Sequence, residues 1–472
     1  MIADLKPYLE YQEAGLQWLS LLPSNWRLLR GKSVFTLVDV RSKTGMEELL
    51  TVSANYGVIP RRQTSVTMFK AKSYIGHKLC WPGDFVVNSL WAWMQGLGVS
   101  NNFGLISSAY SVYRSRPEYS EYGRFFHYLL RSDAYKWELQ TRSKGVWISR
   151  LQLSDLAFMD MPLLLPLPSE QAAIVRFLDH ITRRIERTIH AKRKVIALLN
   201  EQKQAIIHRA VTRGLEPNVR LKSSSIPWLG EIPEHWELWR ISRLAKVGNG
   251  STPSRAKPFY WHGGSYPWLN SANVNRGFID SADQFVTKTA LQECHLPRVP
   301  AGSVLIAITG QGKTRGTVAV LGIEATINQH IAFITPRLSI VTPDFLHLVL
   351  TAAYYTLRAL SEDSGSTKGA LTCEDLKRFK IAIPPRSEQA ALVEYIQKAT
   401  HALRTTISRT EREIDLLREY RTRLIADVVT GKLDVREAAA RLPDEAEKLE
   451  FFDEINDSVE IEEMDAVAEG EA

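Results

Sequence analysis

The sequence predicts an α+β protein in which two mixed, mainly β domains are separated by a pair of long helices that form an antiparallel coiled coil. Two repeated segments lead to this prediction. Residues Trp18–Trp26 recur as Trp228–Trp236, at a constant offset of 210 positions. Residues Pro168–Ala173 recur as Arg386–Ala391, at an offset of 218, and a long helical pattern follows each copy. The repeated segments form two copies of one frame, and the stretch of chain inside each copy, here called an insert, differs between the copies. This pattern indicates a pseudo-twofold repeat with two different binding surfaces, which favours recognition over catalysis.

The long helices are expected over Ser169–Arg213 and Ser387–Gly431. Apolar residues recur along each at alternating steps of four and three, which is the seam of a coiled coil. In the first helix these residues are Ile174, Leu178, Ile181, Ile185, Ile196, Leu199, Ile206 and Ala210, and the positions 218 later repeat them. Lys192 and Thr410 interrupt the seams at the same level, so we expect them to meet near the pseudo-twofold axis. Packing of each helix on its own domain is the alternative.

Each helix has predicted end signals. Ser169 and Ser387 follow prolines and are expected to be N-caps. Gly214 and Gly431 stand where C-terminal glycine caps belong.

Both inserts are expected to be mainly β. The predicted strands are Ser303–Ile308, Gly316–Val320, His330–Ile334, Asp84–Val87 and Ala109–Tyr113. Short helices are expected at Tyr122–Arg131 and Pro343–Leu360. The predicted domains are residues 1–165, a helix within 166–215, residues 216–383, a second helix within 384–433, and an acidic tail, 434–472.

The composition is that of a globular protein, with 44% apolar residues and 24% charged residues. No apolar run approaches the length of a membrane span, and the start of the chain lacks the pattern of a signal peptide. The cysteines Cys80, Cys294 and Cys373 are far apart and have no metal-ligand spacing. We therefore expect a reduced, cytoplasmic protein without a metal site.

The charge is unevenly distributed. Residues 444–472 carry a net charge of −12, so residues 1–443 carry +19 although the whole chain has +7. A body this basic suits a polyanion. The acidic tail is interpreted either as a solubility segment or as a competitor of nucleic acid for the basic body.

Residues Ala307–Thr314 match a permissive phosphate-loop pattern with alanine in the first glycine position. A phosphate loop leads into a helix, whereas here the β-branched, glycine-containing Arg315–Val320 follows and favours a hairpin. The sequence also lacks a methyltransferase Asn/Asp-Pro-Pro-aromatic tetrapeptide, a helicase motif pair and a clear nuclease carboxylate cluster. These features argue against catalysis by this chain alone.

The two repeated segments, here called the sequence marks, resemble those of the specificity subunits of type I restriction–modification enzymes. Ile226–Trp236 opens a variable domain, Pro384–Gln389 closes it, both marks occur twice, and the resemblance covers about residues 5–433. It implies two target recognition domains that each read one half of a split, asymmetric DNA sequence. It also implies spacer helices that dock modification subunits, expected to be two, together with restriction subunits where the complex cleaves DNA. The chain itself is expected to bind no cofactor, while its partners use S-adenosylmethionine and, for restriction, Mg and ATP.

Groove and phosphate contacts need polar and basic side chains on loops. The candidates for DNA binding in the first domain are Asn55, Arg61, Arg62, Asn88, Gln95, Asn101, Asn102, Arg142 and Lys144. In the second domain they are Ser251, Thr252, Asn270, Asn273, Asn275, Arg276, Lys313, Arg315, Asn328, Gln329 and Lys368. Lys313 and Arg315 are placed at a loop tip. The tryptophans Trp91, Trp93, Trp261 and Trp268 are assigned to the domain frames rather than to base stacking.

Two other functions remain as alternatives: a stand-alone P-loop nucleotide-binding protein, and a scaffold whose β domains bind proteins. Binding or hydrolysis of Mg-ATP would identify the first, and absence of salt-sensitive DNA binding would identify the second. The many basic residues of the first long helix suit a solvated face, a phosphate screen or a partner contact.

Overall fold

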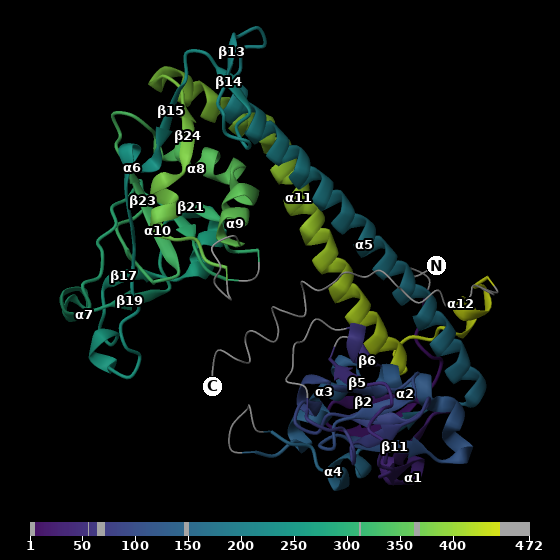
Figure 1. Cartoon of the computed structure of the whole chain (residues 1–472). Coiled ribbons are helices and arrows are strands. Elements are labelled where there is room, and N and C mark those ends of the chain that lie inside the picture. Colours follow the sequence, from purple (N-terminus) through teal and green to yellow (C-terminus); the bar gives the residue numbers. More distant parts are fainter. Residues whose placement is uncertain are drawn as a thin grey trace. The chain divides into compact units, whose positions relative to one another are not determined.

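A computed structural model describes residues 5–54, 56–63, 71–145, 151–310, 313–362 and 369–443 (Figure 1). The chain divides into two compact units, Met1–Ala191 with Glu413–Ala472, and Lys192–Arg412. Each long helix therefore contributes one part to each unit, and each unit holds one of the two predicted β domains.

The first unit contains small sheets and short helices. Its strands are β1 (Tyr11–Leu16), β2 (Leu19–Pro23), β3 (Arg27–Arg30), β4 (Phe35–Val38), β5 (Leu50–Ser53), β6 (Gly57–Pro60), β7 (Lys78–Cys80), β8 (Phe85–Val87), β9 (Leu97–Val99), β10 (Gly104–Ile106), β11 (Ser111–Ser115) and β12 (Pro162–Leu165). Its short helices are α1 (Gly31–Val34), α2 (Gly123–Leu130), α3 (Asp133–Arg142), α4 (Asp155–Met159) and α12 (Arg436–Ala440).

The second unit follows a related plan. Its strands are β13 (Leu221–Ser223), β14 (Glu231–Pro233), β15 (Glu237–Arg240), β16 (Ala245–Asn249), β17 (Tyr266–Leu269), β18 (Phe278–Ile279), β19 (Gln284–Val286), β20 (Val304–Ala307), β21 (Val318–Leu321), β22 (Thr326–Ile327), β23 (Ile331–Pro336) and β24 (Lys380–Ile383). Its short helices are α6 (Ile241–Leu244), α7 (Lys288–Glu293), α8 (Pro343–Ala352), α9 (Tyr354–Glu362) and α10 (Cys373–Arg378).

The long helices are α5 (Pro168–Arg213) and α11 (Arg386–Val429), which confirms both predicted segments. Each begins one residue before the expected serine, so Ser169 and Ser387 lie inside the first turn and the N-cap prediction was wrong. Gly214 and Gly431 have φ values of +73° and +76°, the left-handed conformation of a C-terminal cap, as predicted.

Within each unit the two helix segments run in opposite directions. In the first, Glu186 of α5 and Arg421 of α11 form an ion pair with an Nη1–Oε1 distance of 3.2 Å. In the second, Ile207 near the end of α5 shares a core with Leu392 near the start of α11. The expected Lys192–Thr410 contact stays a prediction. The Thr410 hydroxyl donates to the Thr406 carbonyl at 2.8 Å, within its own helix.

Residues of the repeated segments form hydrogen bonds that connect each β domain to the start of one long helix. Trp26 Nε1 donates to Glu170 Oε1 at 2.9 Å, and Asn25 donates to the other carboxylate oxygen. In the second copy, Trp236 Nε1 donates to Glu388 Oε1 at 3.0 Å, and the carboxylate also contacts the ring of His235. Both tryptophans are fully buried, so their N–H groups need these partners.

The same tryptophans lie beneath the C-terminal glycines. A Cβ at Gly431 would lie 3.5 Å from the Trp26 ring and only 2.5 Å from Pro23. A Cβ at Gly214 would lie 3.4 Å from the Trp236 ring and 3.3 Å from Glu388. Each mark therefore joins the start of one long helix to the end of the other.

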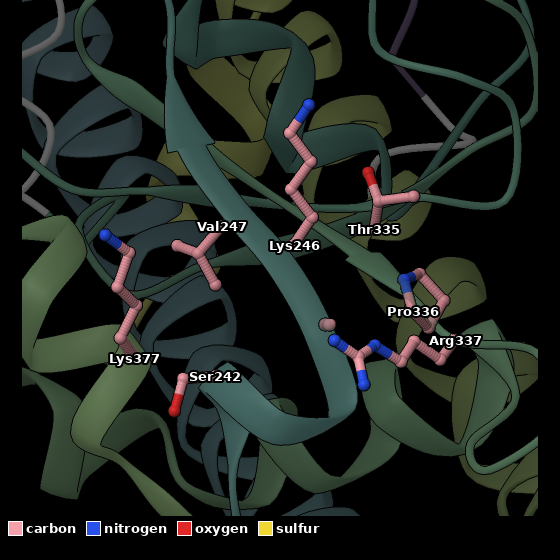
Figure 2. Close-up of a pocket in the computed structure, with 8 residues that line it drawn as sticks. Ser242, Lys246, Val247, Thr335, Pro336, Arg337 and Lys377 are labelled. Atoms are coloured by element: carbon pink, nitrogen blue, oxygen red, sulfur yellow. The ribbon is translucent and has the colours of Figure 1, made fainter.

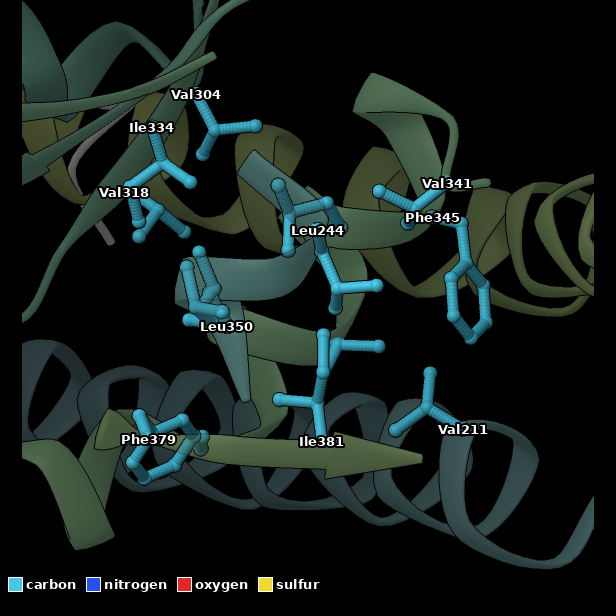
Figure 3. Close-up of a cluster of buried hydrophobic side chains, with 14 of the residues drawn as sticks. Val211, Leu244, Val304, Val318, Ile334, Val341, Phe345, Leu350, Phe379 and Ile381 are labelled. Atoms are coloured by element: carbon cyan, nitrogen blue, oxygen red, sulfur yellow. The ribbon is translucent and has the colours of Figure 1, made fainter. Parts of the chain in front are cut away.

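The main sheet of the second unit has the order β16-β23-β20-β21-β18. Both of its faces are buried, which explains the continuous apolar sequence of β20. One face packs on α8 and on the long helices, where Val304, Val318 and Phe345 lie together with Val211 (Figure 3). The other face packs on a second cluster that contains Leu269, Val299 and Phe333.

The first unit repeats the edge of this sheet. The four-stranded sheet of the first unit has the order β4-β11-β8-β9, and its β4–β11 pair corresponds to the β16–β23 pair of the second unit. Thr36 lies opposite Arg114 in the first pair, and Lys246 lies opposite Thr335 in the second (Figure 2). Aromatic rings fill this core, where Tyr113 stacks on Phe158 with ring centroids 4.2 Å apart.

The predicted strands all occur with shifts of a few residues, as β8, β11, β20, β21 and β23. The predicted helix Tyr122–Arg131 is α2, whereas Pro343–Leu360 is divided into α8 and α9. No helix in the described part of the chain is long and apolar enough to cross a membrane.

Candidate nucleic-acid interface

Three loops of the second unit meet at one end of its main sheet. β16 and β20 end there and β23 begins there. The Thr252 hydroxyl donates to Gln329 Oε1 at 2.6 Å. The ring of His330 lies between its neighbours, with Nε2 3.2 Å from Gln329 Nε2 and Nδ1 2.7 Å from Thr309 Oγ1. We call these four residues the polar tip.

The polar tip has a defined hydrogen-bond polarity. The Gln329 Nε2 amide can only donate, so His330 Nε2 accepts from it, and the other ring nitrogen, Nδ1, donates to Thr309 Oγ1. Gln329 is exposed and keeps one N–H and one acceptor lone pair beyond this chain of bonds. An oriented, exposed amide with a donor and an acceptor side by side suits a base edge.

Gly250 permits this meeting of loops. A Cβ at this position would lie 1.7 Å from the Ile327 carbonyl oxygen, so any side chain would separate the loop after β16 from the turn before β23. Ser251, the next residue, accepts a bond from Trp268 Nε1 at 3.3 Å through its carbonyl. The predicted candidates Ser251, Thr252 and Gln329 are therefore brought together.

The tryptophans of this unit support the loop from below. Trp268 is 4% exposed and contacts Trp261 edge-on at 5.2 Å. Arg255 lies over Trp261 with Cζ 3.7 Å from the ring centroid. The expectation of a frame role fits both rings, whereas Trp91 of the first unit is 41% exposed and stacks on Trp93.

Several other candidates are engaged within their own loop. Asn270 and Asn273 form a reciprocal capping box at the 3₁₀ helix Ser271–Arg276. Asp283 accepts hydrogen bonds from Asn273 and Arg276. Asn275 is exposed. The polar side chains of this 3₁₀ loop therefore serve mainly to build the loop itself, and Asn275 is the amide that it presents to solvent.

The segment that resembled a phosphate loop is a hairpin. β20 and β21 pair antiparallel, and the Gly316 N–H donates to the Ala307 carbonyl at 2.8 Å. Lys313 is exposed, as predicted. The placement of Arg315 at a tip was wrong, because it is 5% exposed and its Nη1 donates to the Gly369 carbonyl at 2.6 Å. Arg315 instead ties the hairpin to the segment before α10.

Asn328 is 5% exposed, and its Oδ1 accepts from the His330 backbone N–H at 3.0 Å. It shapes the turn that carries Gln329 and His330. Lys368 and, in the first unit, Asn55 lie outside the described residues.

The first-unit candidates do not converge in the same way. Gln95 donates to the carbonyls of Arg131 and Ser132, and Arg142 pairs with Glu138. Asn88 donates to the Tyr110 hydroxyl, and Arg62 pairs with Glu48. Asn101 and Lys144 are exposed, and Arg61 and Asn102 are half-buried.

Sequence reasoning missed Thr309 and His330. Each lies within two residues of the end of a buried strand, at the same end of the sheet as Gln329. Since strand order is not visible in the sequence, this convergence was not visible either.

The chain is similar in sequence to known DNA specificity proteins. Residues 233–414 match the family described as type I restriction modification DNA specificity domain. The chain is 27% identical over 180 residues to the EcoR124I/EcoR124II specificity subunit of Escherichia coli. It is 31% identical over 166 residues to the MjaIX specificity subunit of Methanocaldococcus jannaschii. These alignments cover 38% and 34% of this chain, and 44% and 37% of the relatives.

The fold also has a solved counterpart. A chain from a structural study of complex assembly and conformational transition of the type I R-M system is similar with a TM-score of 0.59 at 16% identity. The similarity covers 87% of this chain and 99% of the other. At this identity the likeness concerns the fold.

Proposed function

We propose that this chain is a type I restriction–modification specificity subunit, that it reads the DNA sequence for a type I complex, and that it directs methylation to a bipartite, asymmetric target. The observation that carries the proposal is a duplicated set of three residues, a tryptophan, a glutamate and a glycine, which we call the Trp–Glu–Gly frame. Its two copies are Trp26, Glu170 and Gly431, and Trp236, Glu388 and Gly214. Each copy holds one β domain, and the loops of the two domains differ. Two unlike readers on one repeated frame suit two unlike half-sites.

The polar tip supplies a chemical basis for base recognition in the second half-site. Glutamine pairs with adenine in the major groove by accepting from N6 and donating to N7. Thr252 and His330 fix the Gln329 amide in one orientation before DNA arrives. A preoriented bidentate contact contributes about 1–3 kcal/mol of discrimination against a wrong base. The proposal therefore includes an adenine within the second half-site.

In this function the chain contributes recognition and no bond-making chemistry. The partners are two modification subunits and, where the complex cleaves DNA, restriction subunits. They supply S-adenosylmethionine for methylation and Mg and ATP for restriction, and this chain binds none of these. The acidic segment 444–472, interpreted as a solubility segment or as a competitor of nucleic acid, lies outside the described residues.

The two alternative functions have less support. The antiparallel β20–β21 hairpin is incompatible with a phosphate loop that leads into a helix. A protein-binding scaffold does not need an oriented amide such as that of Gln329, and it predicts no salt-sensitive DNA binding.

The deciding experiment is co-expression of the chain with a candidate type I methyltransferase subunit, followed by mapping of methylated sites in a test genome. We expect one bipartite motif that is absent without this chain. If no new methylation occurs although the two proteins co-purify, the proposal is wrong. If they do not co-purify, the measurement is repeated with a methyltransferase subunit that the chain retains in a pull-down.

A further inference from the structure

A second polar site lies at the opposite end of the β16–β23 pair. Here the start of β16 and the end of β23 line a pocket with a volume of about 520 Å³. We call its polar lining residues the basic groove: Ser242, Lys246, Thr335, Arg337 and Lys377. Figure 2 shows Lys246, Thr335 and Arg337 on one side of the strand that carries Val247, with Ser242 and Lys377 on the other.

The basic groove combines three cations and two hydroxyl groups, and its described lining includes no carboxylate. Lys246 and Arg337 are exposed, and the described residues offer neither of them an ion-pair partner. The carboxylates of α10, the helix that carries Lys377, are engaged elsewhere, because Glu374 pairs with Arg378 and Asp375 accepts hydrogen bonds from the N–H and the hydroxyl of Thr372. Uncompensated cations beside hydroxyl donors are the side chains that contact DNA phosphates.

The first unit keeps parts of the same arrangement. Arg116 follows β11 as Arg337 follows β23, and in both the backbone N–H donates at 2.8 Å to the carbonyl at the end of the preceding short helix, Val34 or Leu244. The cross-strand pairs Thr36–Arg114 and Lys246–Thr335 each join one threonine to one cation, on opposite strands. The arginine position and the threonine–cation pairing thus recur, whereas the tip loops differ.

One difference between the copies makes the second groove more strongly positive. In the first unit, Asp84 binds Arg114 through two hydrogen bonds of 2.7 and 2.8 Å. Ser303 stands at the equivalent place in the second unit, because it directly precedes β20, which pairs with β23, as Asp84 directly precedes β8, which pairs with β11. Its hydroxyl lies 2.8 Å from the Thr335 hydroxyl. Lys246 is consequently not neutralised from this side.

We propose that the basic groove binds backbone phosphates of the DNA whose bases the polar tip reads. The inference rests on the proposed function, which it deepens. The sugar–phosphate backbone is common to any two half-sites, so a contact to it can recur while the base-reading loops diverge. β16 spans Ala245–Asn249, about 13 Å at 3.3 Å per residue, which corresponds to about four base-pair steps along a duplex. By holding the phosphates, the basic groove would fix which base pair of the duplex lies at the polar tip.

The test uses the chain reconstituted with its methyltransferase subunit, and fluorescence anisotropy on duplexes with and without the methylated motif at several salt concentrations. The variant is Lys246→Ala/Arg337→Ala/Lys377→Ala. We expect weaker binding by the same factor on both duplexes. The slope of log K against log salt should fall by about 1 for each phosphate that the variant no longer neutralises, while the methylated motif stays unchanged.

Lys288→Ala is the matched control, because Lys288 is an exposed lysine on α7 that does not line the basic groove. It should leave the slope unchanged. Unchanged affinity and slope in the triple variant would overturn the inference. So would an altered motif, which would indicate base reading, or failure of the methyltransferase subunit to co-purify, which would indicate a protein contact. A wild-type complex that methylates no motif would instead contradict the proposed function.

Discussion

At the scale of single residues, Gln329 carries the sharpest functional prediction. Gln329→Ala removes the oriented donor–acceptor pair but leaves Thr252 and His330 in place. We expect methylation to relax at one adenine position of one half-site, with discrimination reduced by about 1–3 kcal/mol, while the other half-site is unchanged. Methylated-site mapping measures this directly. Thr289→Ala, at an exposed position of α7, is the control. A complete loss of methylation would argue for a structural role instead.

His127 is predicted to make the first unit sensitive to acid. Burial, together with the charges of Arg131 and Arg124, holds the pKa of His127 well below its usual value. The neutral ring accepts the Val99 N–H at Nδ1 with a distance of 3.3 Å. The unfolded chain takes up this proton near pH 6.5 and the folded chain does not, so stability decreases as pH falls below about 6.5, by up to about 1.4 kcal/mol per pH unit.

Urea unfolding at pH 7.5 and 5.5 tests this sign. His127→Asn keeps a hydrogen-bond acceptor but cannot titrate, so it should lose less stability than the wild type between these two pH values. Equal losses in both proteins would show that other groups cause the acid sensitivity.

Residue type alone separated the functional candidates poorly. Arg315 and Gln95 looked like surface contacts, but each satisfies backbone carbonyls far away in the sequence, at Gly369 and at Arg131. Gln329 was selected on the same grounds and does lie at an exposed tip. The partner of a polar side chain is fixed by tertiary structure, and no local pattern records it.

At the scale of elements, the long helices were the most predictable part of the fold because periodicity over many turns is a local signal. The hairpin at β20–β21 was predictable for the same reason, from β-branched residues and glycines. The exact apolar seam was less predictable than the helices themselves. The predicted seam contained Ile206, whereas the buried residue is its neighbour Ile207. Sheet order could not be predicted, since it depends on pairings such as β16 with β23, about 85 residues apart along the chain.

The two ends of the helix pair differ in charge. Arg421 and Glu186 form an ion pair in the first unit, and the positions related by the offset of 218 are Lys203 and Arg404 in the second. There, burial and the charge of Arg404 lower the pKa of Lys203, and Glu411 only partly compensates. An attractive pair at one end thus corresponds to a repulsive pair at the other.

Arg404→Glu should therefore stabilise the second unit. It replaces the repulsion by an ion pair with Lys203, and the gain should be less than about 1 kcal/mol because Arg404 is exposed. The expected result is a higher melting temperature, and the difference from the wild type should shrink at high salt. Arg409→Glu makes the same charge change at another exposed position of α11 and is the control. An equal effect of both substitutions would point to net charge alone.

At the scale of the whole molecule, the duplicated frame predicts that the readers can be exchanged. Each β domain begins with a strand directly after its buried tryptophan and ends with the partner strand directly before a long helix. The terminal residues of these strands are paired, Arg27 with Leu165 and Glu237 with Ile383. Each domain is therefore connected to the rest of its unit through a pair of antiparallel strands, β3–β12 or β15–β24, and the two pairs are equivalent.

A chimera in which Glu237–Ile383 replaces Arg27–Leu165 should fold because each junction falls at this pair of strands and the Trp26–Glu170 bond is kept. Trp18 would take the place that Trp228 has in the second unit, stacked on the ring of Phe379. We expect the chimera to direct methylation to a motif whose two halves are both the second half-site. The reciprocal chimera should duplicate the first half-site, and it serves as the control for a general loss of folding. If a well-folded chimera that still binds its methyltransferase subunit kept the asymmetric motif, base reading would lie outside the exchanged domains, which would contradict the assignment of both reading surfaces.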